Sequence, residues 1–338
     1  DVDGELRMLT APPVGWSVVD LGDPDPADAP PVRAGDGFMD NGVVRIEWDE
    51  QGLLSAVRHL ASGRDALPDG ARANLLQLLD DHPQHWDAWD IDADALEGAV
   101  DLTMLDRLEL VEVDEQRATV RICRSFGSSH IEQLVQLTRG SGRVEIHCAV
   151  DWHETHKLLK VAFPVDVRAA TARHEIQFGH VERPTHTNTS WDAARFETCA
   201  HTWVDLSEHG FGVALLNDSK YGHDVSGNVI RLSLLRAPTW PDPVADRGHH
   251  TFAYALCPHA GSFAEGGVIE QAHGFNTPLR VKPIADRAGS GQSRHHSVVA
   301  VDDPGVVLSA VKVADDGGAM IIRLYEAFGG RRRARLGV

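Results

Sequence analysis

The chain has 338 residues and a formal net charge of −18, with 32 basic and 50 acidic side chains. This length is sufficient for a large hydrophobic core. The negative charge argues against nucleic acid and anionic membranes as partners, because phosphate groups would be repelled over most of the surface. The sequence also contains no apolar run of membrane-spanning length and no signal-peptide pattern.

The cysteines indicate the compartment. Cys123, Cys148, Cys199 and Cys257 are scattered without the paired spacing of a disulfide framework or a Cys-ligated metal site. We therefore expect a reducing, cytoplasmic setting.

The first residues are predicted to form a connector. The chain opens on Asp1 rather than Met, and residues 22–31 are rich in proline, which fixes φ and removes backbone donors. We expect residues 1–34 to be a connector from a missing N-terminal region.

From residue 41 onward, short strand-like segments alternate with turn signals. Residues 144–152 and 159–167 alternate apolar and polar side chains, which predicts half-buried antiparallel strands. Further strands are expected at 43–48, 53–60, 118–126, 130–137, 175–181, 211–216, 229–235 and 251–256. So many strands predict an all-β protein with a large, twisted antiparallel β-sandwich over residues 35–285.

Two segments depart from this pattern. Residues 73–79 contain four leucines and are the single short helix that we expect. Residues 285–293 are small and polar and predict a loop. Beyond it, the strand-like runs 297–301, 306–313 and 320–325 predict that residues 286–338 are a linker and part of a terminal β domain.

Residues 80–92, which we call the tryptophan loop, are the most unusual stretch. Five carboxylates and two of the eight tryptophans fall within these thirteen residues, a density that neither strand nor helix periodicity requires. Indoles stack on sugar rings and carboxylates accept hydrogen bonds from hydroxyls, so the mixture suits a carbohydrate surface. The alternative is a loop whose tryptophans close one end of the core while its aspartates are solvated or cap turns.

Two other regions combine the same residue types. Residues 183–205 contain Trp191, Arg195 and Trp203, and residues 234–243 place Arg236 and Trp240 in a proline-stiffened loop. Such residues line polar sugar sites. The alternatives are a loop held by ion pairs and tryptophan burial in the first region, and a docking edge in the second.

Other kinds of active site find little support. In the segment 151–156 two histidines lie three residues apart after a predicted strand, whereas a helical zinc site needs a spacing of four. There is no Gly-x-Ser-x-Gly motif and no glycine-rich phosphate loop. A catalytic carboxylate pair cannot be chosen from the sequence, because its members must be about 5–9.5 Å apart in space.

Several motifs in one order resemble the C-terminal half of family 38 glycoside hydrolases, the α-mannosidases, in their cytosolic and bacterial branch. These motifs are residues 82–90, 188–192, 205–218 and 234–238, with flanking segments at 11–15 and 323–327. Together they cover nearly the whole chain.

The resemblance implies a β-sandwich of the galactose-mutarotase type, a supersandwich, that packs on an N-terminal catalytic barrel. It further implies that the missing barrel carries the zinc ligands and the catalytic residues, so this chain should contain no cofactor or catalytic residue and should not hydrolyse mannosides alone. The sandwich would lend residues to the rim of the mannose site. The candidates for contact with mannose-containing glycans are Arg236, Trp86, Asp87, Trp89, Asp90 and Arg195.

Three functions remain open at this stage. The chain is expected to complete the active-site wall of a mannosidase and to hold a homo-oligomer together. Alternatively, it is an independent carbohydrate-binding module with a preformed sugar cleft, or a mutarotase-like enzyme with its own convergent acid and base. An apolar surface left by the missing barrel would favour the first.

Overall fold

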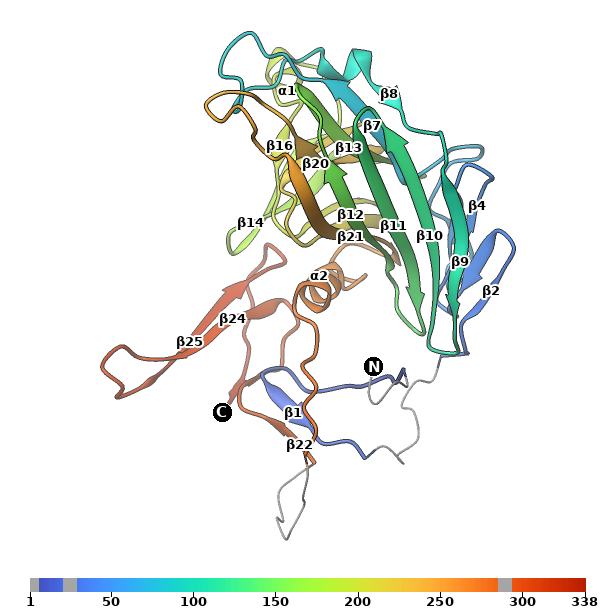
Figure 1. Ribbon diagram of the computed structural model, residues 1–338. Helices are drawn as coiled ribbons and strands as arrows, with labels where there is room; N and C mark the ends of the chain where they lie inside the picture. Colours follow the sequence, from blue (N-terminus) through green and yellow to red (C-terminus); the bar gives the residue numbers. More distant parts are fainter. Residues whose placement is uncertain (1–5, 21–28, 285–293) are drawn as a thin grey trace. The chain divides into compact units, whose positions relative to one another are not determined.

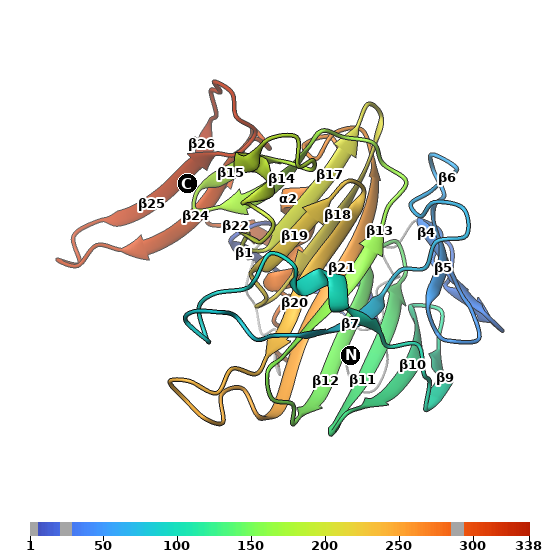
Figure 2. The same cartoon turned by 90° about the horizontal axis from the view of Figure 1, so that it is seen from above.

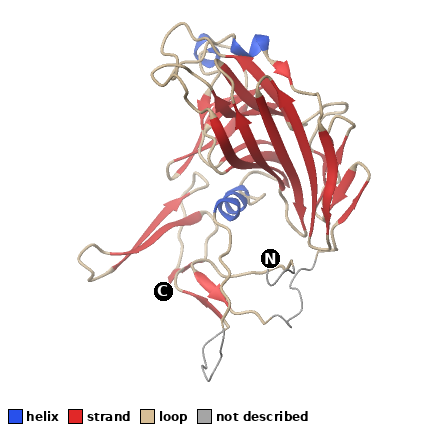
Figure 3. Ribbon diagram, viewed as in Figure 1, coloured by secondary structure: helices blue, strands red, loops and turns tan. Residues whose placement is uncertain are grey.

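The computed structural model describes residues 6–20, 29–284 and 294–338. The chain divides into a large unit, residues 29–175 and 182–276, and a small unit, residues 1–28, 176–181 and 277–338. Strands dominate both units and the helices are short (Figure 3). Most of the proline-rich run at 22–31 and the predicted loop at 285–293 lie outside the described residues.

The largest sheet of the described chain has nine antiparallel strands in the order β15-β14-β17-β18-β21-β12-β11-β10-β9 (Figure 1 and Figure 2). Its strands are β9 (Arg107–Val113), β10 (Arg117–Phe126), β11 (Ser129–Thr138), β12 (Val144–Trp152), β14 (Thr171–Ile176), β15 (Gly179–Pro184), β17 (Trp203–Glu208), β18 (Phe211–Asn217) and β21 (Gly248–Ala260).

A second sheet of six described strands has the order β16-β19-β20-β13-β7-β8. Its strands are β7 (Leu75–Asp80), β8 (Val100–Asp101), β13 (Lys157–Pro164), β16 (Thr198–Cys199), β19 (Gly222–Ser226) and β20 (Val229–Arg236). Apolar side chains from both sheets form one buried cluster, so the large unit is a sandwich (Figure 2).

Smaller elements complete the large unit. A five-stranded sheet contains β2 (Arg33–Gly35), β3 (Phe38–Asp40), β4 (Val44–Trp48), β5 (Leu54–His59) and β6 (Arg64–Asp65). The described helices are the 3-10 helix η1 (Ala95–Gly98), α1 (Ser190–Ala193) and α2 (Val268–Asn276). Helix α2 packs against β17 and β18.

The predicted alternation is confirmed in β12, where Val144, Ile146, Cys148, Val150 and Trp152 are all buried. The neighbouring prediction for residues 159–167 is only partly correct. Strand β13 is buried on both faces rather than one, so Lys160 is fully buried. Strand β13 lies between β20 and β7, and ion pairs compensate the buried charge on its second face.

Strand β18 is buried at every position because both of its faces are covered. Phe211, Val213 and Leu215 belong to the central cluster between the sheets. Ala214 and Leu216 are buried outside that cluster, and helix α2 packs on the strand. The helix therefore closes the outer face of the nine-stranded sheet at this strand.

A buried polar triangle is shared between the two layers. Tyr254 of β21 donates a hydrogen bond to the Asn74 side-chain oxygen at 2.7 Å, and Gln133 of β11 donates to the Tyr254 hydroxyl at 2.7 Å. Burial raises the pKa of Tyr254 well above its usual value. The phenol therefore stays neutral, as a hydroxyl that both donates and accepts.

The small unit consists of paired strands. Strand β1 (Gly15–Ser17) pairs with β22 (His295–Ser297), β23 (Ala300–Val301) with β26 (Leu336–Gly337), and β24 (Val306–Val313) with β25 (Met320–Glu326). Within this unit the Phe178 ring meets Tyr325 edge-on at 5.8 Å between centroids.

Two of the predicted elements are wrong. Residues 73–79 do not form a helix: Leu75–Asp80 is strand β7, which pairs with β13 and β8. A short apolar run cannot distinguish a buried strand from a buried helix. Residues 175–181 are not one strand but contain the turn between β14 and β15, where Phe178 has φ of 60°.

The all-β antiparallel sandwich is confirmed. The boundaries predicted at 34 and 285 stay predictions, as does the relation to the mutarotase type. No helix in the described part of the chain is long and apolar enough to cross a membrane.

Candidate functional site

The tryptophan loop begins where β7 ends and turns tightly at Trp86. The Trp86 carbonyl accepts hydrogen bonds from the backbone N–H groups of Trp89 at 2.7 Å and Asp90 at 2.9 Å. Trp86 has φ of 58°, a left-handed conformation that non-glycine residues rarely adopt. These two hydrogen bonds support the turn and direct two indoles out of the same loop.

Three tryptophans, Trp86, Trp89 and Trp240, are exposed in this region, and we call them the tryptophan rim. Their exposed fractions are 67%, 65% and 57%. Trp89 meets Trp240 edge-on, with ring centroids 5.8 Å apart, although the two residues come from different loops. The alternative in which the loop tryptophans close the end of the core is therefore wrong.

Arg236, at the end of β20, holds the tryptophan loop in place. Its Nε donates to Asp81 at 2.5 Å and its Nη2 donates to the other Asp81 oxygen at 2.9 Å. The Asp81 side chain is only 3% exposed. Such a two-point ion pair fixes both partners in orientation, which a single contact does not.

The remaining donors of Arg236 reach the backbone of the same loop. Nη1 donates to the Ala88 carbonyl at 3.2 Å, and Nη2 donates to the Asp90 carbonyl. Because a guanidinium has five N–H bonds, these contacts leave one for anything outside the chain. Most of the Arg236 donors are thus engaged in holding the tryptophan loop.

Asp87 joins the tryptophan loop to the loop that follows β20. Its Oδ2 accepts hydrogen bonds from the backbone N–H of Thr239 at 2.7 Å and of Trp240 at 2.9 Å. Its Oδ1 lies 3.4 Å from Nδ1 of His156. Desolvation raises the pKa of Asp87, but these hydrogen bonds and His156 outweigh it and hold the pKa below its usual value. The carboxylate is therefore charged at neutral pH and fixes the separation of Trp89 and Trp240.

The second dense region is organised separately. Thr189 and Asp192 form a reciprocal capping box at the start of α1, and Trp191 is 77% exposed. Arg195 is exposed, and no contact recorded for the described residues joins its side chain to the tryptophan rim. The structure thus brings five of the six predicted residues together and leaves Arg195 apart.

A buried ion cluster beneath this region was not predicted. Lys160 contacts both Glu197 and Asp224, at 2.7 Å from the Asp224 oxygen, and Arg231 donates to the other Asp224 oxygen at 2.8 Å. Burial raises the pKa of Glu197, and Lys160 partly offsets this. The available signal was Lys160, a lysine between Leu159 and Val161 in a strand-like run. A lysine that becomes buried is almost always paired with an acidic group, so its position could have indicated a buried ion pair.

Two neighbouring histidines are held neutral by burial. Desolvation lowers the pKa of His174 to about 4 and that of His223 to about 3. Thr198 connects them, since its hydroxyl lies 3.1 Å from Nε2 of His174 and donates to the His223 carbonyl at 3.1 Å.

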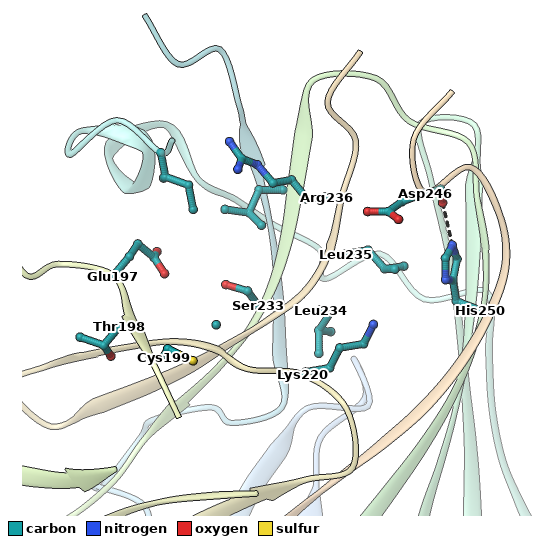
Figure 4. A pocket seen from close by; sticks show the side chains of 13 residues that line it. Glu197, Thr198, Cys199, Lys220, Ser233, Leu234, Leu235, Arg236, Asp246 and His250 are labelled. Atoms are coloured by element: carbon teal, nitrogen blue, oxygen red, sulfur yellow. Dashed lines mark hydrogen bonds between the residues drawn. The ribbon is translucent and has the colours of Figure 1, made fainter. Parts of the chain in front are cut away.

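A cavity of about 540 Å³ lies beside Arg236 (Figure 4). It is lined by residues of β13, β16, β19, β20 and β21, together with Ile91, Glu197, Lys220 and Asp246. Figure 4 shows Arg236 at the edge of this space, above Glu197 and Ser233 in the view. Arg236 thus lines the cavity and also contacts the tryptophan loop.

Within the described parts of the chain, no group of three or more His, Cys, Asp or Glu side chains could hold a metal ion. In the 151–156 segment, Glu154 instead accepts hydrogen bonds from Ser128 and Ser129, each at 2.8 Å.

Two family models match the chain. The Glycosyl hydrolases family 38 C-terminal domain matches residues 39–244, and the Glycosyl hydrolases family 38 C-terminal beta sandwich domain matches residues 305–338. The first match covers most of the large unit, including the whole tryptophan rim.

Named relatives and solved structures agree with these matches. The chain is 43% identical to Alpha-mannosidase 2C1 of Homo sapiens and 34% identical to Alpha-mannosidase G of Dictyostelium discoideum, in each case over 96% of this chain and 32% of the relative. It thus spans about a third of these relatives. An α-mannosidase structure from Enterococcus faecalis V583 matches with a TM-score of 0.75 and 14% identity, over 89% of this chain and 38% of that one.

The family match rests on the sequence models, and the solved structure adds the shared fold. The chain belongs to the C-terminal domain family of the family 38 glycosyl hydrolases, the family of the α-mannosidases.

Proposed function

We propose that this chain is the sandwich portion of an enzyme that hydrolyses terminal α-linked mannose, and that its tryptophan rim faces the bound glycan. Family membership supports the reaction class. The observation that carries the assignment of the site is the construction of the rim. Three exposed indoles are held by a buried ion pair and a bridging carboxylate rather than by burial in a core.

The exposed indoles suit a sugar because pyranose rings present C–H faces that pack on aromatic surfaces. Trp86 and Trp89 would contact the glycan, together with Trp240. Asp87 and Arg236 would position them, and the Asp90 backbone is held by Arg236. Arg195 lies apart from the rim and would contact a more distant part of the glycan.

In this proposal, hydrolysis takes place in a separate catalytic barrel. The described residues form β-sheets and do not include that barrel. The relatives are about three times as long as this chain. We place zinc, the nucleophile and the acid/base in the N-terminal barrel of such a protein. That barrel would be the partner on which this sandwich packs. The free thiols of the four cysteines fit a cytoplasmic setting. For the assembly, we propose a homo-oligomer.

Turnover of an aryl α-mannoside tests this division of roles. The purified chain, with added Zn²⁺ or Co²⁺ and with EDTA as control, should show no turnover. The full-length protein should turn over the substrate in a metal-dependent manner. Metal-dependent turnover by the chain alone would overturn the proposal.

The rim is tested in the full-length protein. Trp86→Ala and Trp89→Ala should each raise KM for a mannose oligosaccharide about tenfold, the equivalent of about 1.4 kcal/mol, and leave metal content unchanged. Trp16→Ala is the control, since this indole is also exposed, at 46%, but lies on β1 of the small unit. An unchanged KM in both rim variants would remove the rim from substrate binding.

A further inference from the structure

The cavity beside Arg236 has the size and lining of a small-molecule site. Its volume of about 540 Å³ is within the range of about 300–1,000 Å³ that such sites have. It opens within the large unit, so it does not depend on how the two units are arranged. The tryptophan rim lies outside it, because none of the three indoles lines the cavity.

One wall of the cavity is apolar. Leu158 of β13 and the consecutive Leu234 and Leu235 of β20 line it, with Ile91 from the tryptophan loop. Their backbones belong to paired strands, with Leu158 opposite Arg236 in the register of β13 and β20. The three leucines are only 2%, 2% and 5% exposed, so the half-buried Ile91 is the apolar side chain that can pack against the C–H face of a sugar ring.

The facing polar groups have unused hydrogen-bonding capacity. Glu197 gives one carboxylate oxygen to Lys160, and its other oxygen has no hydrogen-bond partner among the described residues. The Ser233 hydroxyl is buried and likewise has no partner there. Both oxygens are turned toward the same space (Figure 4). Because an unsatisfied buried polar atom is unfavourable, a ligand hydroxyl placed between them would satisfy Ser233 and would find an acceptor in Glu197.

The charges of the lining favour a neutral ligand. Glu197 and Asp246 are acidic and Lys220 is basic, while Arg236 is already paired with Asp81. The Asp246 backbone carbonyl is bonded to Nε2 of His250 at 2.6 Å, which shapes the edge of the cavity (Figure 4). Two carboxylates would repel a phosphate or carboxylate ligand. The Lys220 ammonium lies over the Phe252 ring, 4.5 Å from its centroid, and its N–H groups can still donate to a ligand hydroxyl.

We propose that this cavity is a second carbohydrate-binding site, which accepts one neutral hexose unit against Ile91 and binds its hydroxyls through Glu197, Ser233 and Lys220. This site is distinct from the tryptophan rim. It requires no catalytic group, so it stands whether or not the proposed hydrolysis is correct.

Binding is measured on the purified 338-residue chain by saturation-transfer NMR and calorimetry, with D-mannose and D-glucose as probes and mannose 6-phosphate as the anionic comparison. A site for one hexose should bind with a Kd in about the millimolar range, given the small number of ligand atoms. A mannose disaccharide measured in parallel distinguishes a glycan residue from a free monosaccharide as the natural occupant. If neither neutral sugar binds, or if mannose 6-phosphate binds more tightly than mannose, the proposal is overturned.

Variants assign the binding to the cavity. Lys220→Met keeps the aliphatic stem and removes the donor, and Ser233→Leu fills the space beside Leu234; each should weaken hexose binding at least tenfold. Lys220→Met serves if Ser233→Leu does not fold, because Gly222 lies close to Ser233.

Trp86→Ala separates this site from the rim. It should leave hexose binding by the chain unchanged while it raises KM for the oligosaccharide in the full-length protein. Loss of hexose binding in Trp86→Ala, or unchanged binding in Lys220→Met, would place the sugar outside the cavity. An unchanged KM in the rim variants would contradict the proposed function alone.

Discussion

Arg236 donates two hydrogen bonds to Asp81, at 2.5 Å and 2.9 Å, across 155 residues of sequence. The pair joins the end of β20 to the start of the tryptophan loop, and the same guanidinium then reaches two carbonyls of that loop. The position of the exposed indoles is therefore determined by a buried contact that no sugar would touch.

Replacing Asp81 tests this support directly. Asp81→Asn should destabilise the chain by about 3–5 kcal/mol, because it leaves the Arg236 charge buried without its partner. Urea unfolding measures the loss, and hydrogen exchange should increase over residues 82–92. Asp80→Asn is the matched control: Asp80 is exposed and pairs with Lys157 at the surface, so a change of less than about 1 kcal/mol is expected.

Asp87 should control the contact between the two loops. Asp87→Ala removes the acceptor for two backbone N–H groups of the 239–240 segment, a loss of about 1–2 kcal/mol. Hydrogen exchange should rise at Thr239 and Trp240 in particular. Asp90→Ala should leave both amides protected, because the Asp90 side chain accepts only from Ile91 among the recorded contacts of the described chain. Equal exchange in the two variants would show that Asp87 does not join the loops.

The ion cluster around Lys160 should respond asymmetrically to substitution. Lys160→Met leaves Asp224 and Glu197 without their shared cation and should destabilise the chain by about 3–5 kcal/mol. Glu197→Gln should have a smaller effect, because burial already raises the pKa of Glu197 and so disfavours its charged form. Chemical denaturation compares the two. Lys157→Met, at the partly exposed start of the same strand, is the control.

Stability should fall in mild acid because of His174 and His223. Burial lowers their folded-state pKa values to about 4 and about 3, below the usual histidine pKa of 6.5. The unfolded chain therefore binds more protons as the pH falls below about 6.5, and stability present above that pH is lost progressively down to the folded-state values. Each histidine contributes a slope of about 1.4 kcal/mol per pH unit in this window.

His174→Gln should reduce the slope of the free energy of unfolding between pH 6 and pH 4.5 by about one proton. His153→Gln, at an exposed position, should leave the slope unchanged. The raised pKa of Glu197 acts in the opposite direction, so the slope is measured in the Glu197→Gln background as well. The same slope in all variants would contradict neutral burial of His174.

The strands that were predicted correctly are those whose alternation reflects one buried face. Strand β12 is such a case, since its apolar side chains face the core and its polar ones do not. Strand β13 has the same pattern but is buried on both faces, and the pattern could not show that Lys160 would find Glu197 and Asp224. An alternating pattern indicates that one face of a strand is buried. Whether the other face is also buried depends on the elements that pack on it, which the pattern does not show.

The candidate site was predictable as a composition but not as an arrangement. The density of tryptophans and aspartates in residues 80–92 indicated a shaped loop, and its indoles are exposed as a sugar surface requires. The roles within it could not be predicted. Asp81 was not among the predicted site residues, and Arg236 was expected to contact the glycan. Their ion pair depends on the pairing of strands that are far apart in sequence, so the sequence pattern could not indicate it.

Strand β21 is the last strand of the nine-stranded sheet in the sequence, yet it lies between β18 and β12 in the middle of that sheet. Until residues 248–260 have left the ribosome, a growing chain holds two half-sheets, each with an open hydrogen-bonding edge. Such edges invite pairing with other chains. A chain that stops before residue 248 should therefore aggregate rather than fold into a smaller sandwich, and the joining of the halves by β21 would be the late step of folding.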